Sequence, residues 1–331
     1  MSHTPRSVIE FSDVTLRHGS LTRLDTLSFS AGQGEVLALL GHNGAGKTTT
    51  MHLILGLLSP DSGRVEVLGG APDNRHAASL RQRLGYLPEN VSFYEALTGL
   101  EVLDYFARLK RADRRQVPTL LEKVGLGHAA RRRIKTYSKG MRQRLGLAQA
   151  LLGEPSLVLL DEPTTGLDPA ATRDFYTTLD ELRGRGGSVV LSSHILPGIE
   201  PYIDRALVLG GGQRLALGSM QSLREEAALP VTLRVCGQLA SEDWQALTQK
   251  PHHAVLSRGA NGVELAVPEY AKLDTLRTLA AMPGVTDIAV EPPTLEDLYR
   301  HFSQAAVPPA SSVSSSANPA MSAQAVQESR P

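Results

Sequence analysis

The segment at residues 41–48, GHNGAGKT, constrains the fold of this chain more than any other, because it matches the phosphate-binding pattern G-x-x-x-x-G-K-[ST] in full. A continuous apolar run at 36–40 precedes it, and a helical pattern follows from Lys47 to about Leu58. Glycines let backbone N–H groups turn inward around phosphate oxygens, and the N-terminus of the helix adds a favourable dipole. The pattern therefore predicts an α/β core that binds phosphate where the strand meets the helix.

The composition limits which classes of protein remain. The 331 residues suffice for one large domain and a small one. Lysine plus arginine number 34, as do aspartate plus glutamate, so there is no net positive charge of the kind that nucleic-acid binding uses, and we expect no nucleic-acid partner. The single cysteine, Cys236, rules out an internal disulfide. No apolar run reaches the ~18–20 residues that a bilayer span needs, and no apolar export signal follows Met1.

Residues 6–225 have the pattern of one α/β unit. Residues 7–35 alternate between apolar and polar side chains, which predicts an antiparallel β subdomain of short strands. The period then becomes helical, and we expect a helical insert at about 90–153. Beyond the insert, apolar strands alternate with a helix as in a parallel sheet, at 157–160, 170–184, 188–192 and 205–209.

A second, smaller unit is predicted after Pro230. The patterns between 231 and 303 predict a small α+β accessory domain. Thr294 and Asp297 have the spacing of a capping box, so the last helix should begin there. Residues 304–331 are rich in Ala, Ser, Pro and Gln and contain almost no bulky apolar side chains, which predicts a disordered tail.

Two acidic residues, Asp161 and Glu162, stand at the carboxyl end of an apolar strand, where ligands of open α/β sheets collect. In the phosphate-binding loop, Lys47 would reach the β- and γ-phosphates, and the hydroxyl group of Thr48 would ligate Mg²⁺. We expect Asp161 to hold the same ion and Glu162 to polarise the attacking water. The alternative is that the acidic pair only caps the following turn.

The segment Tyr137-Ser138-Lys139-Gly140-Met141 predicts a second contact with phosphate. Ser-x-Gly means little alone, but here it opens a helical segment between the phosphate-binding loop and the acidic strand. Such a surface cannot reach the loop of its own chain, so we expect the active unit to be a pair of chains. His194 and the turn at 166–168 are uninformative by themselves.

Together, and in this order, these elements resemble the nucleotide-binding domain of ATP-binding-cassette (ABC) proteins over roughly residues 6–225. The resemblance implies a P-loop NTPase fold, ATP and Mg²⁺ as ligands, ATPase activity, and a head-to-tail homodimer. It also implies that the signature at 137–141 contacts the γ-phosphate held by the partner chain, that His194 acts with the catalytic Glu162, and that Asp168 belongs to the D-loop. The implied ATP contacts are Gly41, His42, Asn43, Gly44, Ala45, Gly46, Lys47, Thr48 and Thr49 within the chain, and Ser138, Lys139, Gly140 and Met141 across the dimer.

Three positions depart from the family pattern. Glu89 replaces the glutamine of the Q-loop; it can still ligate Mg²⁺, but a carboxylate cannot donate hydrogen bonds as an amide does. His18 stands where the family has an aromatic residue that stacks on adenine, and its imidazole offers a smaller face. The signature contains Lys139 and Met141; the lysine either adds positive charge near the phosphate or points to solvent.

We expect this chain to be the ATPase subunit of a membrane transporter rather than a soluble ABC protein that acts on DNA or ribosomes. It has a single cassette, no heptad insert and balanced charge. The resemblance then implies integral-membrane permease subunits as partners, contacted through the helical insert, and a location on the cytoplasmic face of the inner membrane. The basic cluster at 131–135 would help this docking or simply form a solvated helix face.

Four sequence segments resemble one particular kind of ABC ATPase. Residues 40–44, 85–91, 135–144 and 293–299 are similar to the ATPase of the ABC system that matures the copper enzyme nitrous oxide reductase. This similarity implies a periplasmic copper-handling protein as a partner. The ATPase of a lipid, drug or peptide exporter is the alternative. The sequence itself has no pattern of copper ligands, since Cys236 is solitary and the histidine pair at 252–253 has no carboxylate or thiol set beside it.

Overall fold

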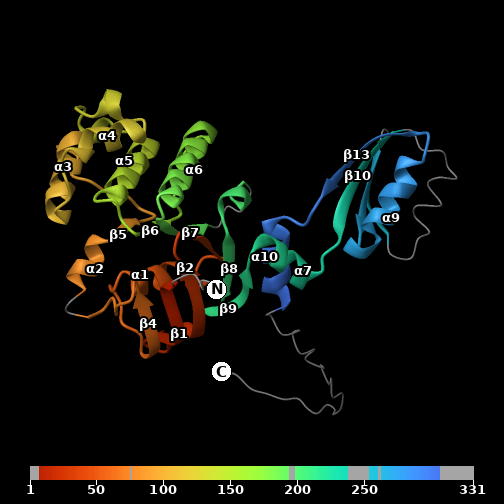
Figure 1. Ribbon diagram of the computed structural model, residues 1–331, viewed down its shortest axis with the longest axis horizontal. Helices are drawn as coiled ribbons and strands as arrows, with labels where there is room; N and C mark the ends of the chain where they lie inside the picture. The colour runs from red at the N-terminus through yellow and green to blue at the C-terminus, as the bar shows by residue number, and fades with distance from the viewer. Residues whose placement is uncertain (1–6, 75–76, 194–197, 238–252, 260–261, 306–331) are drawn as a thin grey trace, which may run out of the picture.

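The computed structural model arranges the chain in three β-sheets and the helices that cover them (Figure 1). The structure describes residues 7–74, 77–193, 198–237, 253–259 and 262–305. His194 and nearly all of the predicted tail at 304–331 lie outside these ranges.

The largest sheet carries the phosphate-binding loop. Its strands are β3 (Val36–Leu40), β5 (Leu84–Leu87), β6 (Leu157–Asp161), β7 (Ser188–Ser193), β8 (Arg205–Gly210) and β9 (Gln213–Gly218). They lie in the order β5-β6-β7-β3-β8-β9, with the first five parallel and β9 antiparallel. Strand β7 therefore lies between β3, which leads into the loop, and β6, which ends at the first of the two acids.

A three-stranded antiparallel sheet lies beside it. Its strands, β1 (Ser7–His18), β2 (Leu21–Gly32) and β4 (Ser62–Val67), have the order β2-β1-β4. The alternating pattern of residues 7–35 predicts this antiparallel pairing, but the strands are not short: β1 and β2 have 12 residues each. His18 pairs with Leu21 across the turn that joins them.

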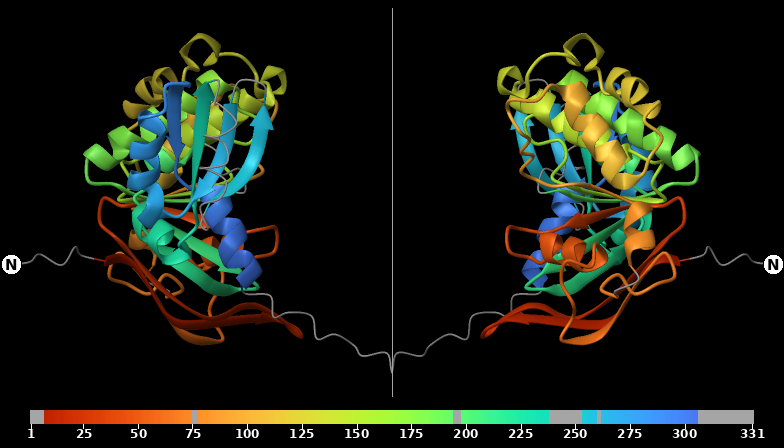
Figure 2. Two further views of the ribbon diagram at one scale, coloured as in Figure 1. Left: turned by 90° about the vertical axis from the view of Figure 1, so that its right-hand side faces the viewer. Right: turned by 90° about the vertical axis from the view of Figure 1, so that its left-hand side faces the viewer.

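The six-stranded sheet is covered on both faces, as its continuous apolar strands predict (Figure 2). Along β3, Ala38 packs with the helical insert, whereas Leu37 and Leu39 pack with the antiparallel sheet and with α1 (Lys47–Ile54). Leu159 and Leu160 of β6 divide in the same way. Because successive side chains of a strand point to opposite faces, a strand between two cores is apolar along most of its length.

Four of the described helices on the insert side bury apolar stripes in the core. They are α3 (Gly99–Lys110), α4 (Gln116–Lys123), α5 (Lys139–Leu151) and α6 (Pro169–Gly184), and the short α2 (Ala78–Gln82) precedes β5. Thr98 begins α3 with a capping box, in which its Oγ1 accepts from Glu101 N at 3.2 Å and the Glu101 carboxylate accepts from Thr98 N at 2.8 Å. Leu103 and Leu121 are fully buried on these stripes. The first three helices lie within the predicted insert at 90–153.

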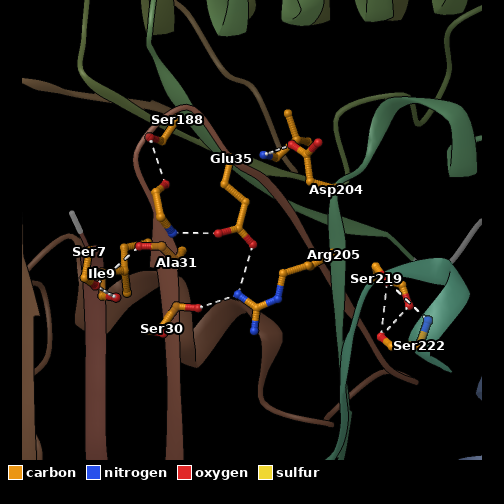
Figure 3. Close-up of polar contacts among 12 residues, drawn as sticks. Ser7, Ile9, Ser30, Ala31, Glu35, Ser188, Asp204, Arg205, Ser219 and Ser222 are labelled. Atoms are coloured by element: carbon orange, nitrogen blue, oxygen red, sulfur yellow. Dashed lines mark hydrogen bonds and ion pairs between the residues drawn. The ribbon is translucent and has the colours of Figure 1, made fainter. Parts of the chain in front are cut away.

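A polar junction joins the two sheets where β2 leads into β3 (Figure 3). Glu35 accepts a hydrogen bond from Gly32 N at 2.6 Å and pairs with Arg205 Nη1 at 3.2 Å. The same guanidinium donates to Ser30 O at 3.2 Å. Because the Glu35 side chain is only 12% exposed, these partners replace hydrogen bonds that its carboxylate would otherwise make to water.

The third sheet follows Pro230. Its strands, in the order β11-β12-β10-β13, are β10 (Val231–Gly237), β11 (Ala254–Gly259), β12 (Gly262–Val267) and β13 (Val285–Glu291). Helix α9 (Glu269–Ala280) packs on one face, where Leu279 joins Leu233 and Leu265 in a small core. The sequence pattern does not predict β11, because all six of its residues are exposed and none alternates with a buried one.

The last helix, α10 (Leu295–Ala305), begins as expected. Thr294 N donates to Asp297 Oδ2 at 3.0 Å, and Asp297 N donates to Thr294 Oγ1 at 3.2 Å. The predicted capping box is thus confirmed.

The packing of α10 differs from the expected division of the chain. Leu295, Leu298 and Phe302 are buried in the core of the larger unit rather than against the third sheet. The helix lies beside α7 (Met220–Ala227), away from α9 and β13 (Figure 1). The single accessory domain expected at 231–303 therefore loses its last helix to the first unit.

The junction gives a first prediction. Glu35→Ala should lower the free energy of unfolding by about 2 kcal/mol, because it removes the carboxylate partner of Arg205 and the acceptor of Gly32 N in a half-buried place. Urea unfolding followed by circular dichroism measures the change. Arg277→Ala is the control, since the Arg277–Asp274 pair is 77% and 79% exposed and its loss should change the value by less than about 0.5 kcal/mol. Equal effects of the two substitutions would contradict the role of the junction.

Candidate functional site

The phosphate-binding loop places a buried lysine at its centre. Lys47 is 7% exposed, and its Nζ donates to Gly41 O at 2.6 Å and to His42 O at 3.4 Å. The same Nζ lies 3.9 Å from Glu162 Oε1. The ammonium group thus stands between the loop carbonyls and a carboxylate, ready to meet further negative charge.

Glycine is required in the loop where other elements come close. Gly46 has a φ of 110°, and a Cβ atom there would lie 2.7 Å from Leu24 Cδ2. Gly44 also has a positive φ, 88°. Both conformations are strained for any residue with a side chain. The backbone can therefore turn its N–H groups inward only with glycine at these positions.

The acids at the end of β6 meet the loop through hydroxyl groups. Thr48 Oγ1 donates to Asp161 Oδ2 at 3.0 Å, and Ser192 Oγ donates to Asp161 Oδ1 at 2.5 Å. Asp161 is 2% exposed, so each of its oxygens has a donor where water is scarce. The strand order explains this contact, because β7 brings Ser192 opposite Asp161 between β6 and β3.

Ser192 also holds the second acid in place. Its Oγ accepts a hydrogen bond from Glu162 N at 2.9 Å. Glu162 has a φ of 50°, a left-handed conformation that is uncommon outside glycine, and its side chain is nearly buried. Strain of this kind is concentrated at functional sites. The sequence reasoning missed Ser192, although two serines that end an apolar strand beside an acidic strand would have been the signal.

A cavity of about 330 Å³ lies over the loop. Most of the predicted contact residues line it: His42, Asn43, Gly44, Gly46, Lys47, Thr48, Thr49, Glu89, Asp161 and Glu162. Gly41 and Ala45 of the loop are buried and are not among the lining residues. His18 is exposed at the β1–β2 turn and is not among the lining residues, so its contact with adenine stays a prediction. Arg23 of β2 lines the cavity, and the sequence reasoning did not identify it.

Tyr86 adds a neutral group beside the acids. Burial raises its pKa to about 12, and the negative charges of Asp161 and Glu89 act in the same direction. The phenol therefore keeps its proton throughout the neutral range and remains a hydrogen-bond donor next to two carboxylates.

The signature segment lies at the start of α5. Ser138 is the N-cap, and its Oγ accepts from Met141 N at 3.2 Å. The aliphatic part of Lys139 lies against Gly166, where a Cβ atom would be 3.0 Å from Lys139 Cδ. Among the residues that line the described cavity, none belongs to the signature. The two phosphate-contact surfaces predicted from the sequence are thus separate within one chain.

The D-loop segment is tied to its own helix and to α5. Asp168 is the N-cap of α6, and its Oδ1 accepts from Ala171 N at 2.8 Å. Gln143 of α5, 4% exposed, donates from Nε2 to Pro163 O at 3.1 Å, next to the acidic pair. The sequence reasoning did not single out Gln143, whose role depends on a contact between distant segments.

Comparisons with known proteins agree with this geometry. Residues 24–165 match the family model described as "ABC transporter". An uncharacterized ABC transporter ATP-binding protein of Bacillus subtilis is 37% identical over 270 residues, which is 81% of this chain and 86% of the relative. The daunorubicin resistance ATP-binding protein of Streptomyces coeruleorubidus is 34% identical over 298 residues, covering 86% and 92%. The Nod factor export ATP-binding protein I of Rhizobium meliloti is 33% identical over 299 residues, covering 89% and 88%.

Solved structures agree in fold. An ATP-binding subunit of an ABC transporter, 32% identical, superposes with a TM-score of 0.62 over 66% of this chain and 92% of its own. The ADP conformation of the ATP-binding cassette MJ1267, 24% identical, has the same coverage and a TM-score of 0.59. With the relatives above, these matches lead to one conclusion. The chain belongs to the family of ABC transporter ATP-binding proteins, whose cassettes are ATPases coupled to transport.

Proposed function

We propose that two copies of this chain bind two ATP molecules between them and drive a membrane permease by closing and opening. The observation that carries the proposal is the separation of the two contact surfaces. Lys47, Thr48 and both acids face one cavity, whereas Ser138 caps a helix outside that cavity. A second chain in head-to-tail orientation brings its own Ser138 and Gly140 to the γ-phosphate, as the family pattern implies.

In this proposal the phosphate end of ATP lies at Lys47. The ammonium group exchanges its contacts with the loop carbonyls for the β- and γ-phosphates. Glu162, 3.9 Å from that ammonium group, accepts a hydrogen bond from the attacking water and orients it toward the γ-phosphorus. Attack forms a new bond from phosphorus to the water oxygen and breaks the bond to the β–γ bridging oxygen, which leaves with ADP, while the water gives its proton to the Glu162 carboxylate. His194, outside the described residues, is proposed to contact the γ-phosphate from the end of β7.

The residues present fit Mg²⁺ as the accompanying ion. Thr48 Oγ1 and Asp161 Oδ2 lie 3.0 Å apart, and the Glu89 carboxylate lines the same cavity, so the donors are all oxygens. Mg²⁺ offsets the negative charge of the phosphate oxygens when it is bound. Glu89 differs from the family's glutamine because it brings an additional negative charge and no N–H donor to this position.

Helix α5 is proposed to carry the nucleotide state to the permease. A Cβ atom at Gly146 would lie 2.6 Å from Leu87 Cδ1, so this helix packs closely on the strand that leads to Glu89. Gln143 ties the same helix to Pro163. Movement of either segment therefore moves the insert, which is the proposed contact surface for the permease.

The membrane spans of the complex are assigned to the permease partner. Among the residues that the structure describes, none of the helices combines the length and apolar character that a bilayer span requires. We propose that the chain is held at the cytoplasmic face of the inner membrane through that partner.

Export is the direction of transport that the relatives favour. Two relatives that align with more than four fifths of this chain bear the names of a drug-resistance and an export ATP-binding protein. We therefore propose that this chain powers an exporter.

Maturation of the copper site of nitrous oxide reductase is the second candidate, favoured by the four sequence segments at 40–44, 85–91, 135–144 and 293–299. The described residues contain no group of three or more histidine, cysteine or acidic side chains that could hold a metal, so in this candidate a periplasmic partner would handle the copper.

Glu162→Gln tests the hydrolytic role. ATP turnover should fall by about 100-fold or more, because the amide is too weak a base to activate water, while ATP binding is retained and the ATP-bound dimer persists. Phosphate release and size-exclusion chromatography with ATP measure the two effects. Glu226→Gln, an exposed residue of α7, is the matched control and should turn over like wild type. Unchanged turnover in Glu162→Gln would remove this residue from the mechanism.

Mixing two inactive variants tests the shared site. Lys47→Ala removes the phosphate-binding lysine, and Ser138→Ala removes the signature contact. A mixed dimer contains one site with both lesions and one site that is intact. ATPase activity should therefore be partly restored on mixing, whereas each variant alone stays low. Wild-type turnover of Ser138→Ala alone, or no gain on mixing, would contradict the head-to-tail arrangement.

The cargo is tested in cells whose own copy is replaced by the Glu162→Gln variant. Daunorubicin should accumulate in these cells, while the copper content of nitrous oxide reductase in a denitrifying host stays at the wild-type level. Glu226→Gln cells provide the control. Loss of copper from the reductase with unchanged drug accumulation would favour the second candidate and contradict the first.

A further inference from the structure

Arg23 is a cation of the nucleotide cavity that no motif includes. It belongs to β2 and lines the cavity together with the loop and the acids. Its side chain is exposed, and within the described ranges its guanidinium group makes no hydrogen bond or ion pair. The permanently charged guanidinium group of Arg23, with its N–H donors available, thus faces the place where a nucleotide is proposed to bind.

The backbone of Arg23 is held rigidly against the phosphate-binding loop. The β8–β9 turn forms the link, since Gly212 N donates to Ala45 O at 3.2 Å and Gly212 O accepts from Asp25 N at 3.0 Å. A Cβ atom at Gly212 would lie 2.6 Å from Arg23 O, so only glycine permits this approach. Arg23 therefore keeps its position relative to the loop, unlike His18 at the open end of the β1–β2 turn.

The cavity has two chemically different walls. Lys47 and the three carboxylates Glu89, Asp161 and Glu162 come from the six-stranded sheet and its loops. Arg23 comes from the antiparallel sheet. A nucleotide whose phosphates lie at Lys47 extends its ribose and base away from the acids, and hence toward the wall that Arg23 forms.

That wall offers no aromatic ring to the base. The residues that line the described cavity include no Phe, Tyr or Trp, and the ring of His42 is engaged with Asn43 O at 2.7 Å. A guanidinium group is planar, always charged and weakly hydrated, so it stacks on aromatic faces. We propose that the guanidinium group of Arg23 stacks on the base of the bound nucleotide, in the place of an aromatic side chain.

This inference rests on the proposed binding of ATP and deepens it, because it predicts the selectivity of the site. A flat cation contacts the π face of a base and does not read its hydrogen-bonding edge. Purines offer a larger face than pyrimidines. The site should therefore bind adenine and guanine nucleotides with similar affinity and cytosine nucleotides more weakly.

Calorimetric titration of the full chain with MgADP, MgGDP and MgCDP tests the proposal without hydrolysis. Arg23→Ala should weaken MgADP binding by about 5- to 30-fold and remove the preference for purines. Arg23→Lys should behave like Arg23→Ala, because lysine keeps the charge but loses the plane. Arg17→Ala, an exposed arginine of β1 that does not line the cavity, is the matched control and should bind like wild type.

A base-free probe separates stacking from phosphate binding. Inorganic tripolyphosphate with Mg²⁺ should bind wild type and Arg23→Ala equally well. An equal loss of affinity for tripolyphosphate and MgADP, or full retention of MgADP affinity in Arg23→Lys, would overturn the proposal in favour of a charge contact. Unchanged MgADP affinity in a folded Arg23→Ala variant, checked by its unfolding midpoint, would also overturn it. Failure of wild type to bind any of these nucleotides would instead contradict the proposed function on which the inference rests.

Discussion

The buried carboxylate of Asp161 is the constraint on which the site depends. A charge that is 2% exposed must be met by donors, and these come from Thr48 on α1 and Ser192 on β7. The two hydrogen bonds therefore fix the relative positions of three chain segments that are far apart in sequence. Any ligand that displaces Thr48 from Asp161 must supply a replacement for that donor. A divalent cation can take the place of that donor, because it binds carboxylate oxygens directly. The burial of Asp161 thus serves both the fold and the binding of a cation.

The sequence predicts those features that depend on local pattern. Strands β3, β6, β7 and β8 of the parallel sheet are recognisable by their apolar runs, because they lie between two cores, and the capping box at Thr294 and Asp297 marks the start of α10. A local pattern is not enough to identify the roles of Ser192 and Arg23, even though two serines end the apolar strand that contains Ser192. Their importance follows from the strand order and from the contact of the β8–β9 turn with the loop, neither of which has a local pattern.

The misplaced last helix shows the same limit. The spacing of Leu295, Leu298 and Phe302 identifies an apolar stripe, but a stripe does not say which core it covers. Proximity in sequence favours the third sheet, whereas the structure packs α10 beside α7. One further hydrogen bond holds it there, from Leu295 N to Glu200 Oε1 at 2.7 Å. This bond ties the start of α10 to Glu200, a residue of the larger unit.

Helix α5 connects the two halves of the proposed composite site. In the proposed dimer its N-terminus presents Ser138 to the partner chain, while Gln143 on the same helix donates to Pro163 beside the acids of its own chain. Because a buried amide without its acceptor costs free energy, the hydrogen bond from Gln143 to Pro163 O opposes movement of α5 away from the segment that follows the acids. In the proposed dimer, phosphate that the partner's loop brings to Ser138 would therefore affect the end of β6, where Glu162 lies. On this proposal α5 couples the two sites mechanically, without any contact between the two nucleotides.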